Sequence, residues 1–400
     1  MKRDVTDEEL GRPLVPYREA VERIVGSFGA LAPRDVALSE ALGLIIAEPI
    51  VSPHDVPGFD NSAMDGYAVI ASDTPGALTI VDDLPAGTVG TRTIEPGTAA
   101  KIMTGAPLPP GADAVVPWED TELRGVEVVV KVAFAPRRHV RPRAEDVRAG
   151  DEVIASGSAL GPVHLGVAAS VGRTHVLAHP RPGVAILSTG DELAEPGAVL
   201  EPGQVFDANR AVLRAMCERA GAAVVADALI GDDPAAITAW LHEAAAKADL
   251  IITSGGASVG EHDWIRAILE EQGSLTLWRI AIKPGKPVAF GAIDGTRVLG
   301  LPGNPGSAFV GAHVFVQPAI RALAGRDPSP TRLTKTLADD VKGSQGRTQF
   351  TRVRIEGEHA IPLPAQSSVV LSNLLGTQGF AIVEPGGARV GSDVTVELLD

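Results

Sequence analysis

Cysteine is almost absent from this 400-residue sequence, which contains only Cys217. A single thiol excludes a disulfide within the chain, which is typical of proteins from a reducing compartment. Aromatic residues make up only 4% of the sequence, so the hydrophobic cores must depend on aliphatic side chains. No apolar run is long enough to span a bilayer, and the charged residues 1–10 lack the apolar core of a signal peptide. These absences predict a cytoplasmic protein without a membrane partner.

Basic residues are in the minority, with 35 Lys and Arg against 50 Asp and Glu and a formal net charge of -15 at pH 7. An acidic surface repels the phosphate backbone, which argues against a nucleic-acid partner. A small anionic ligand is not excluded, because nearby lysines and backbone N–H groups can outweigh the overall charge. The sequence also lacks a Walker-A run, a strand-linked Gly-x-Gly-x-x-Gly motif and metal-ligand spacing among its histidines.

The chain is too long for one hydrophobic core, so we expect several domains. Apolar spacing predicts helices over residues 16–28 and 37–44. Short apolar runs broken by Gly and Pro predict a mostly β domain up to residue 147 and a small β domain after residue 331. Between residues 182 and 326, strands alternate with helices, which predicts a parallel sheet covered on both faces.

Four loops in this α/β segment follow predicted strands and carry small, polar or acidic residues. They span residues 188–192, 231–234, 254–260 and 300–307. In an open α/β sheet, ligands bind beyond the carboxyl ends of the strands, and glycines let backbone N–H groups approach a phosphate. One Gly-rich loop by itself is more often only a turn. The occurrence of four such loops on one sheet predicts a ligand site.

Charged residues in and near these loops indicate the kind of ligand. Carboxylates at Glu192, Asp232 and Asp263 suit a hard cation such as Mg²⁺, which prefers oxygen ligands and substrate phosphates. An Asp at the start of a helix is as often an N-cap, so Asp232 and Asp263 are ambiguous when taken alone. Lys283 and Lys286 suit a phosphate or another oxyanion, although either lysine alone would be a solvated surface charge.

Several segments occur in an order typical of one family. They are residues 60–68, 103–107, 188–193, 254–263, 282–287 and 300–307. Through these segments the chain resembles the MoeA family, which includes the C-terminal domain of gephyrin, over nearly its whole length. The run Asn-Ser-Ala-Met-Asp-Gly-Tyr-Ala at residues 61–68 is the most specific part of the match. The resemblance implies an enzyme that inserts molybdenum from molybdate into adenylylated molybdopterin, with Mg²⁺-dependent release of AMP, as the last step of molybdenum cofactor synthesis.

The resemblance also implies an architecture of α/β and β domains in an elongated four-domain subunit. We expect an elongated linker region (14–50 and 148–178), a mostly β domain (51–147), a three-layer α/β molybdopterin-binding domain (179–326) and a small C-terminal domain resembling a β-barrel (327–400). The implied assembly is a homodimer with its active site across the interface. The molybdopterin adenylyltransferase of the preceding step is a candidate partner.

Individual roles follow from the same resemblance. Catalytic roles fall on Asp65, Thr104, Asp146, Glu192, Asp232, Asp263, Lys283 and Lys286. Magnesium ligation falls on Glu192, Asp232 and Asp263. Substrate binding falls on Ser254, Gly255, Gly256, Ser258, Gly260, Pro302, Asn304, Ser307, Arg347, Arg352, Ser367 and Ser372. Ala257 and Gly306 stand where the family pattern has Val, and both remove apolar bulk beside the expected site.

Two other functions remain open at this point. A molybdopterin adenylyltransferase shares the α/β loops but does not need the β-rich segment or the β tail. A non-catalytic molybdopterin-binding or scaffold protein should have lost its carboxylates, yet Asp65, Glu192, Asp232 and Asp263 are all present. The sequence therefore favours the enzyme, and it does not distinguish molybdate from tungstate as the natural oxyanion.

Overall fold

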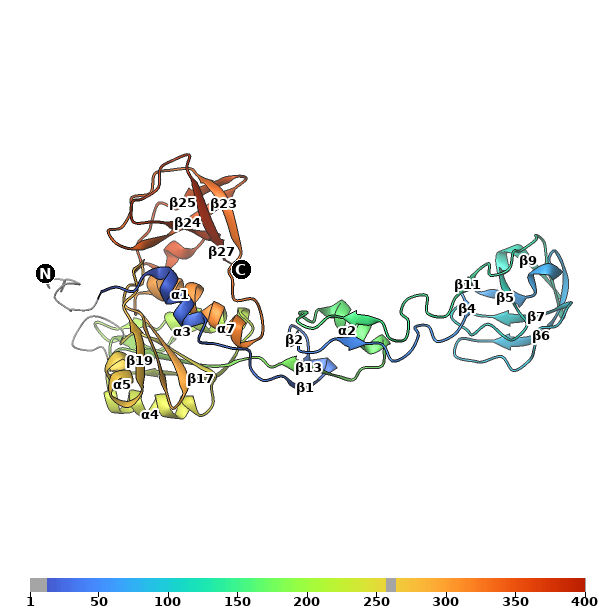
Figure 1. Ribbon diagram of the computed structural model, residues 1–400, viewed down its shortest axis with the longest axis horizontal. Coiled ribbons are helices and arrows are strands. Elements are labelled where there is room, and N and C mark those ends of the chain that lie inside the picture. The colour runs from blue at the N-terminus through green and yellow to red at the C-terminus, as the bar shows by residue number, and fades with distance from the viewer. Residues whose placement is uncertain (1–12, 257–263, 400) are drawn as a thin grey trace. The chain divides into compact units, whose positions relative to one another are not determined.

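The computed structural model describes residues 13–256 and 264–399 and divides the chain into two compact units (Figure 1). One unit contains residues up to 34, residues 43–45 and everything from residue 179 onward. The other contains residues 35–42 and 46–178. Among the described helices, none has the length and apolar character needed to cross a bilayer.

A six-stranded sheet forms the centre of the α/β domain in the first unit. Its strand order is β17 (Ala223–Ile230), β14 (Gly183–Thr189), β18 (Leu250–Ser254), β22 (Thr296–Leu301), β21 (Ala289–Ile293) and β19 (Ser274–Trp278). The first four strands are parallel, as predicted, but β21 and β19 are antiparallel to their neighbours. The prediction of a purely parallel sheet was wrong because Asp294 and Gly295, both with positive φ, form a hairpin turn between β21 and β22.

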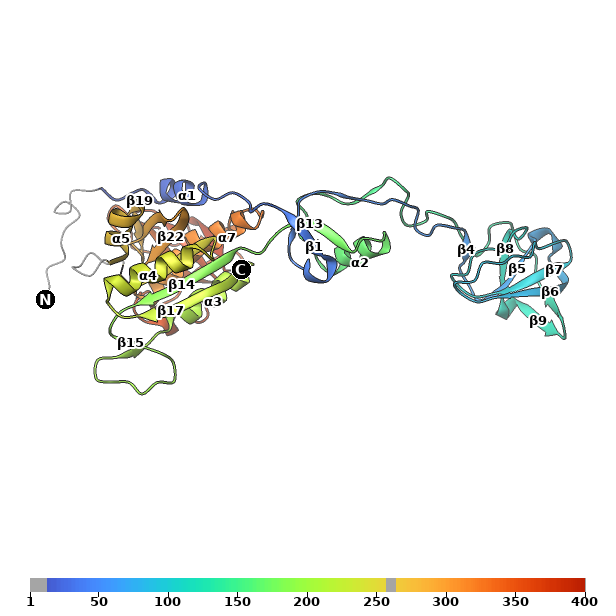
Figure 2. The same ribbon diagram turned by 90° about the horizontal axis from the view of Figure 1, so that it is seen from below.

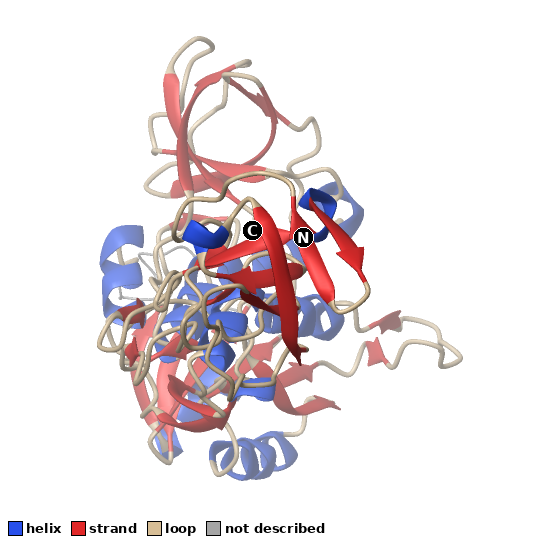
Figure 3. Ribbon diagram, turned by 90° about the vertical axis from the view of Figure 1, so that its right-hand side faces the viewer, coloured by secondary structure: helices blue, strands red, loops and turns tan. Residues whose placement is uncertain are grey.

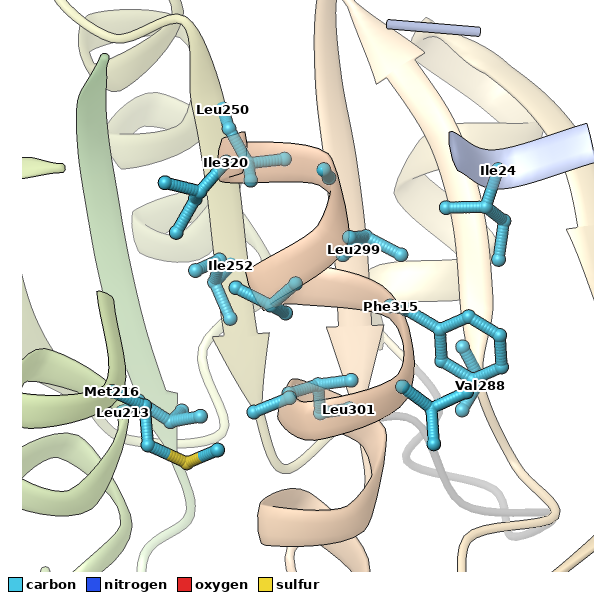
Figure 4. Close-up of a cluster of buried hydrophobic side chains, with 14 of the residues drawn as sticks. Ile24, Leu213, Met216, Leu250, Ile252, Val288, Leu299, Leu301, Phe315 and Ile320 are labelled. Atoms are coloured by element: carbon cyan, nitrogen blue, oxygen red, sulfur yellow. The ribbon is translucent and has the colours of Figure 1, made fainter. Parts of the chain in front are cut away.

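Helices cover both faces of this sheet, which confirms the predicted three layers. One face packs against α1 (Tyr17–Val25), α3 (Asn209–Arg219) and a helical stretch made of α6 (Pro305–Gly311), η4 (Ala312–Val316) and α7 (Gln317–Leu323). The other packs against α4 (Pro234–Ala245) and α5 (Trp264–Gln272), and Figure 2 shows α3 and α4 beside β14 and β17. Figure 4 shows the first layer, where Leu213 and Phe315 approach the strand residues Ile252 and Leu301. Aliphatic side chains supply most of this core, as the low aromatic content predicts.

The helix predicted up to Leu323 is present, but its middle turn, η4, is π-helical. Pro318 follows this turn closely. Because proline lacks an N–H and its ring clashes with the carbonyl four residues earlier, the regular hydrogen-bond ladder cannot pass through this point. The wider turn places His313 within the π-helical segment.

The C-terminal domain is a closed five-stranded barrel (Figure 3). Its strands pair in the order β24 (Thr348–Glu356), β25 (His359–Pro362), β23 (Arg332–Leu337), β27 (Asp393–Leu398) and β26 (Gly379–Val383), and β26 closes the ring onto β24. The short strand β20 (Ile282–Lys283) pairs with β24, and a single short helix, η5 (Leu371–Leu374), precedes β26. Closure removes the open strand edges that would otherwise invite aggregation.

The second unit contains a six-stranded sheet with an apolar cluster on each face. Its order is β8 (Ala114–Pro117), β5 (Gly66–Val69), β7 (Thr98–Ile102), β6 (Gly76–Leu84), β10 (Glu127–Val130) and β9 (Thr121–Arg124). The short pairs are β4 (Asn61–Ser62) with β11 (Val140–Arg141) and β3 (Ile50–Val51) with β12 (Glu152–Ile154). The helix α2 (Pro162–Ser170) and the strands β2 (Ile45–Ile46) and β13 (His175–His179) complete the outline.

The helix expected over residues 37–44 is absent. This segment instead contains the end of β1 (Arg34–Ala37) and the single 3₁₀ turn η1 (Leu38–Glu40). Helices of this length are marginal without strong packing, and here β1 pairs with β13 while the Leu38 N–H donates to the Thr174 carbonyl at 2.8 Å. Pairing with a distant strand therefore overrides the local helical pattern.

Candidate functional site

The four loops predicted as a ligand site follow the four parallel strands, so they meet at one edge of the sheet. The Gly255 N–H donates to the Leu301 carbonyl at 3.2 Å, which joins the loops after β18 and β22. Gly255 has φ +91°, and a Cβ there would lie 2.2 Å from the Thr189 carbonyl oxygen. Only glycine allows the loop after β18 to pass so close to the end of β14. The predicted convergence is therefore present, and we refer to it as the strand-end edge.

Asn209, at the start of α3, holds two of these loops together. Its side-chain amide donates to Ser254 Oγ at 2.8 Å and to the Gly303 carbonyl at 2.7 Å. The sequence pattern does not single out this residue, because an Asn at a helix start is usually a capping residue. Here the N-cap is Ala208, and the side chain of Asn209, the first residue of the helix, bonds to the loops instead.

Carboxylates follow β14 and β17 at this edge. The Asp232 N–H donates to Asp191 Oδ1 at 2.9 Å, so Asp191 connects the two loops. The Glu192 carboxylate folds back toward Gly190, where a Cβ would lie 2.5 Å from Glu192 Oε2. The N-cap of α4 is Asp233, which accepts hydrogen bonds from two backbone N–H groups. This assignment means that Asp232 does not serve as the cap.

Oxygen ligands of the kind that Mg²⁺ prefers are thus available at the edge, from Glu192 and Asp232. Within residues 13–256 and 264–399, no three His, Cys, Asp or Glu side chains cluster closely enough to hold a metal ion. The third predicted ligand, Asp263, lies outside the described residues, as do Ser258, Gly260 and Ala257. The donor chemistry fits a hard divalent cation.

A cavity of about 390 Å³ lies between the α/β domain and the barrel, and we call it the cationic cavity. Its lining residues are Lys283, Pro284, Gly285, Lys286, Pro287, Asn304, Ser307, Arg347, Gln349, Phe350, Gln366 and Ser368. Five of these were predicted as site residues: Lys283, Lys286, Asn304, Ser307 and Arg347. Among the described residues, the lining contains three cationic side chains and no carboxylate, in a chain whose net charge is -15.

A larger cavity of about 800 Å³ lies between α1 and the ends of β26 and β27, and no predicted site residue lines it.

The remaining predicted residues of the C-terminal domain lie behind the cavity wall or away from it. Arg352 is 3% exposed, and its guanidinium donates to the carbonyls of Ala365 (2.7 Å) and Ser367 (3.1 and 3.2 Å). Burial lowers the pKa of Arg352 below its ordinary value. Arg352 therefore holds the loop that carries Ser368, which lines the cavity in place of the predicted Ser367. Ser372 lies on η5 and does not line this cavity.

Gly306 has a structural reason to differ from the family pattern. Its N–H donates to the Ser368 carbonyl at 2.8 Å. A Cβ on residue 306 would lie 3.0 Å from both Ser368 Cα and the Ser368 carbonyl oxygen. The missing side chain lets the loop from the barrel come close to the start of α6, which closes one wall of the cationic cavity.

The predicted residues of the β domain belong to the second unit. Asp65 Oδ1 accepts hydrogen bonds from the backbone N–H and the hydroxyl of Thr104, both at 2.7 Å. The Thr104 backbone and side chain hold the pKa of Asp65 below its ordinary value, so this exposed carboxylate is ionised at neutral pH. Gly66 allows the close pairing of β5 with β8, since a Cβ there would lie 2.0 Å from the Val116 carbonyl oxygen. Asp146 is exposed, and its backbone N–H donates to the Val56 carbonyl at 3.0 Å.

Comparisons with known proteins cover almost the whole chain. Family models described as "MoeA N-terminal region (domain I and II)", "Probable molybdopterin binding domain" and "MoeA C-terminal region (domain IV)" match residues 15–172, 185–322 and 334–399. Molybdopterin molybdenumtransferase 2 of Mycobacterium tuberculosis is 40% identical over 341 residues, which are 82% of this chain and 84% of that protein. Molybdopterin molybdenumtransferase of Haemophilus influenzae is 38% identical over 372 residues, covering 90% of this chain and 92% of that protein.

Solved structures give the same result for the fold. Two structures of the molybdopterin biosynthesis MoeA protein from Pyrococcus horikoshii superpose with TM-scores of 0.81 and 0.74 at 33% and 29% sequence identity. They cover 96% and 97% of this chain, and 99% and 100% of the Pyrococcus chains. The sequence matches and the structural superpositions therefore cover the same part of the chain, which is almost all of it.

Proposed function

Because this chain belongs to the MoeA family and is a transferase of molybdenum cofactor biosynthesis, we propose that it transfers molybdenum from molybdate to adenylylated molybdopterin and releases AMP. The observation that carries this proposal is the cationic cavity beside the strand-end edge. Loop 301–307 contributes to both places, since Gly303 accepts a hydrogen bond from Asn209 and Ser307 lines the cavity. An oxyanion and a phosphate-bearing substrate can therefore be held next to each other.

The cavity is suited to a tetrahedral oxyanion. Lysine and arginine form charge-assisted hydrogen bonds with oxyanions, and the lining offers Lys283, Lys286 and Arg347 together with the hydroxyls of Ser307 and Ser368. Within residues 13–256 and 264–399, no carboxylate lines the cavity to repel the bound anion. We assign this cavity to molybdate before its metal is transferred to the dithiolene sulfurs.

The strand-end edge is suited to the adenylylated substrate. Because Gly255 and Gly256 carry no side chain, phosphate oxygens can come close to the backbone of the loop after β18. Mg²⁺ held by Glu192 and Asp232 would neutralise phosphate charge there. Water adds to the phosphorus, the phosphoanhydride bond breaks and AMP leaves, while the amides stabilise the developing negative charge. Ser254 and Asn209 keep the two loops in register during this step.

A third part of the proposed site comes from a second copy of the chain. We assign Asp65 and Thr104 to the active site of the partner copy in a homodimer, with Asp146 in the same region. The ionised Asp65 carboxylate, held by two hydrogen bonds, is preorganised to orient a cation or a water molecule.

The first experiment incubates the purified protein with adenylylated molybdopterin, Mg²⁺ and molybdate, and follows both AMP and active cofactor. We expect AMP release that depends on molybdate and a product that activates an apo-molybdoenzyme. Chelation of the divalent cation should stop AMP release but leave molybdate binding intact, because the cavity binds its anion through protein cations. Tight substrate binding without turnover would instead support the scaffold function.

Mixing two inactive variants tests the shared active site. In a heterodimer of Asp65→Ala and Glu192→Ala chains, one site carries both changes and the other carries neither. We expect activity to return on mixing after dissociation and reassociation, to about half the wild-type rate per heterodimer. Mixtures that stay inactive despite forming heterodimers would place Asp65 and Glu192 in the same subunit's site.

The adenylyltransferase alternative is disfavoured by the regions on either side of the molybdopterin-binding domain. MoeA-specific models match residues 15–172 and 334–399. The barrel also supplies Arg347, Gln366 and Ser368 to the cationic cavity, so the site as described needs the C-terminal domain.

A further inference from the structure

A buried carboxylate far along the sequence connects three parts of the first unit. Glu397, on β27, is 1% exposed. Its Oε1 accepts hydrogen bonds from Arg332 Nε (3.2 Å) and Nη2 (2.9 Å) on β23 and from the Tyr17 hydroxyl (3.3 Å) on α1. Its Oε2 lies 3.4 Å from His313 Nε2 in the π-helical turn η4. The barrel, the N-terminal helix and the α/β domain therefore meet at one side chain.

This carboxylate is ionised despite its burial. Burial alone would raise the pKa of Glu397, but the His313 imidazole and the Arg332 guanidinium outweigh that effect and hold its pKa below the ordinary value. Burial and the neighbouring Glu397 raise the pKa of Tyr17 above its ordinary value. The phenol therefore stays protonated and donates a hydrogen bond to Glu397. A buried charge with partners on three elements resists any movement that separates them.

The same elements reach the cationic cavity. The Tyr17 ring packs edge-on against Phe350 with centroids 5.2 Å apart, and Phe350 lines the cavity. The helical stretch that contains His313 begins with α6, whose Ser307 is also a lining residue. The His313 ring lies 5.3 Å from Phe380, which in turn contacts Phe350 at 6.2 Å. The ring links are packing contacts, and the link from His313 to Ser307 runs along one helical stretch.

We propose that Glu397 is a positioning residue for the oxyanion: by binding Tyr17, Arg332 and His313, it fixes the barrel against the α/β domain and so sets the separation of the two walls of the cationic cavity. Glu397 does not line that cavity. Lys283 is already tied to the barrel, because β20 pairs with β24 next to Arg347. The effect of Glu397 therefore reaches the anion only through the distance between Lys286 and Ser307 on the α/β side and Arg347 and Gln349 on the barrel side. This inference rests on the proposed function in one respect, since it takes molybdate as the occupant.

The test uses Glu397→Gln, which keeps the shape of the side chain and removes its charge. We expect the KM and the Kd for molybdate to rise about tenfold, while kcat at saturating molybdate stays within about twofold of wild type. Glu356→Gln is the matched control, because Glu356 is an exposed carboxylate of the same domain, paired with Arg354 at 2.7 Å. A fall in thermal stability with molybdate affinity within twofold of wild type would overturn the proposal.

A second readout separates this proposal from the proposed function. Amide hydrogen exchange without any ligand should become faster in Glu397→Gln along Tyr17–Val25 and along residues 305–323, with no change in α4, which packs on the other face of the sheet. Unchanged exchange in those segments would overturn the positioning role, even if wild-type protein bound no molybdate and the proposed function itself failed. If Glu397→Gln does not fold, Tyr17→Phe removes one donor but keeps the ring contact. A molybdate Kd raised two- to fivefold in that variant would support the proposal, and an unchanged Kd would contradict it.

Discussion

The strand-end edge and the cationic cavity belong to the same compact unit and share loop 301–307, yet their charges are opposite. The edge carries carboxylates after β14 and β17. Two lysines and one arginine line the cavity, with no carboxylate from the part of the chain that the structure describes. The two regions are also formed differently. Strand ends and glycines form the edge, whereas contacts between two domains form the cavity. The comparison supports separate places in the structure for the proposed substrate activation and the proposed oxyanion binding.

The largest effect should come from removing a carboxylate at the edge. Glu192→Ala is expected to lower AMP release by about 100-fold or more, because a ligand to the cation is lost where phosphate charge must be neutralised. The melting temperature should stay close to wild type, since Glu192 is exposed. Steady-state AMP release is the measurement, with the nearby exposed Glu201→Ala as control. A fully active Glu192→Ala protein would refute the assigned role.

A substitution in the cationic cavity should weaken molybdate binding and leave substrate binding almost unchanged. Arg347→Ala is expected to weaken molybdate binding by about 10–100-fold, the equivalent of losing one or two charge-assisted hydrogen bonds of about 1.5 kcal/mol each. Magnesium-dependent binding of adenylylated molybdopterin should be almost unchanged. Isothermal titration with molybdate measures the loss, and Arg354→Ala removes an exposed arginine of the same barrel as control. Equal losses for both ligands would show that the two regions are not separable.

Asn209 connects the regions, so its removal should affect both by a moderate amount. Asn209→Ala deletes the hydrogen bonds to Ser254 Oγ and the Gly303 carbonyl, and we expect a loss of about 1–2 kcal/mol in the free energy of unfolding. Both AMP release and molybdate affinity should fall by several-fold. Chemical denaturation and the two activity assays measure these changes. An effect confined to one ligand would assign Asn209 to that region alone.

The smallest expected effect concerns the wall of the cavity. In Gly306→Ala, the new Cβ would lie 3.0 Å from the Ser368 backbone, so the barrel loop must move by a few tenths of an ångström. We expect molybdate affinity to fall about two- to fivefold without a change in substrate binding. The neighbouring Gly303→Ala is the control, since a Cβ there meets only an ordinary contact at 3.6 Å. Competition between molybdate and the similarly shaped tungstate and sulfate would show whether the selectivity also changes.

The strand-end edge could be predicted from the sequence, whereas the cationic cavity could be predicted only in part. Alternation of apolar strands with helices placed the four loops on one sheet edge, because parallel strands end on the same side. The sequence did not reveal Asn209, Gln366 or Ser368, whose roles depend on contacts between segments far apart in the chain. Likewise, Arg352 was expected to bind substrate, but its buried guanidinium donates hydrogen bonds to the carbonyls of Ala365 and Ser367 in its own domain. Local patterns were also misleading at residues 37–44, where pairing with β13 replaces a short helix.

The burial of Cys217 has a consequence for metal selectivity. Cys217 lies on the buried face of α3 and is 0% exposed, and burial raises the pKa of its thiol to about 12. Thiolates are the form of cysteine that binds soft metals, so almost none is available at neutral pH. The only sulfhydryl of the chain is thus kept in its protonated form, away from the proposed site. The proposed transfer of molybdenum therefore meets no competing thiolate from this chain.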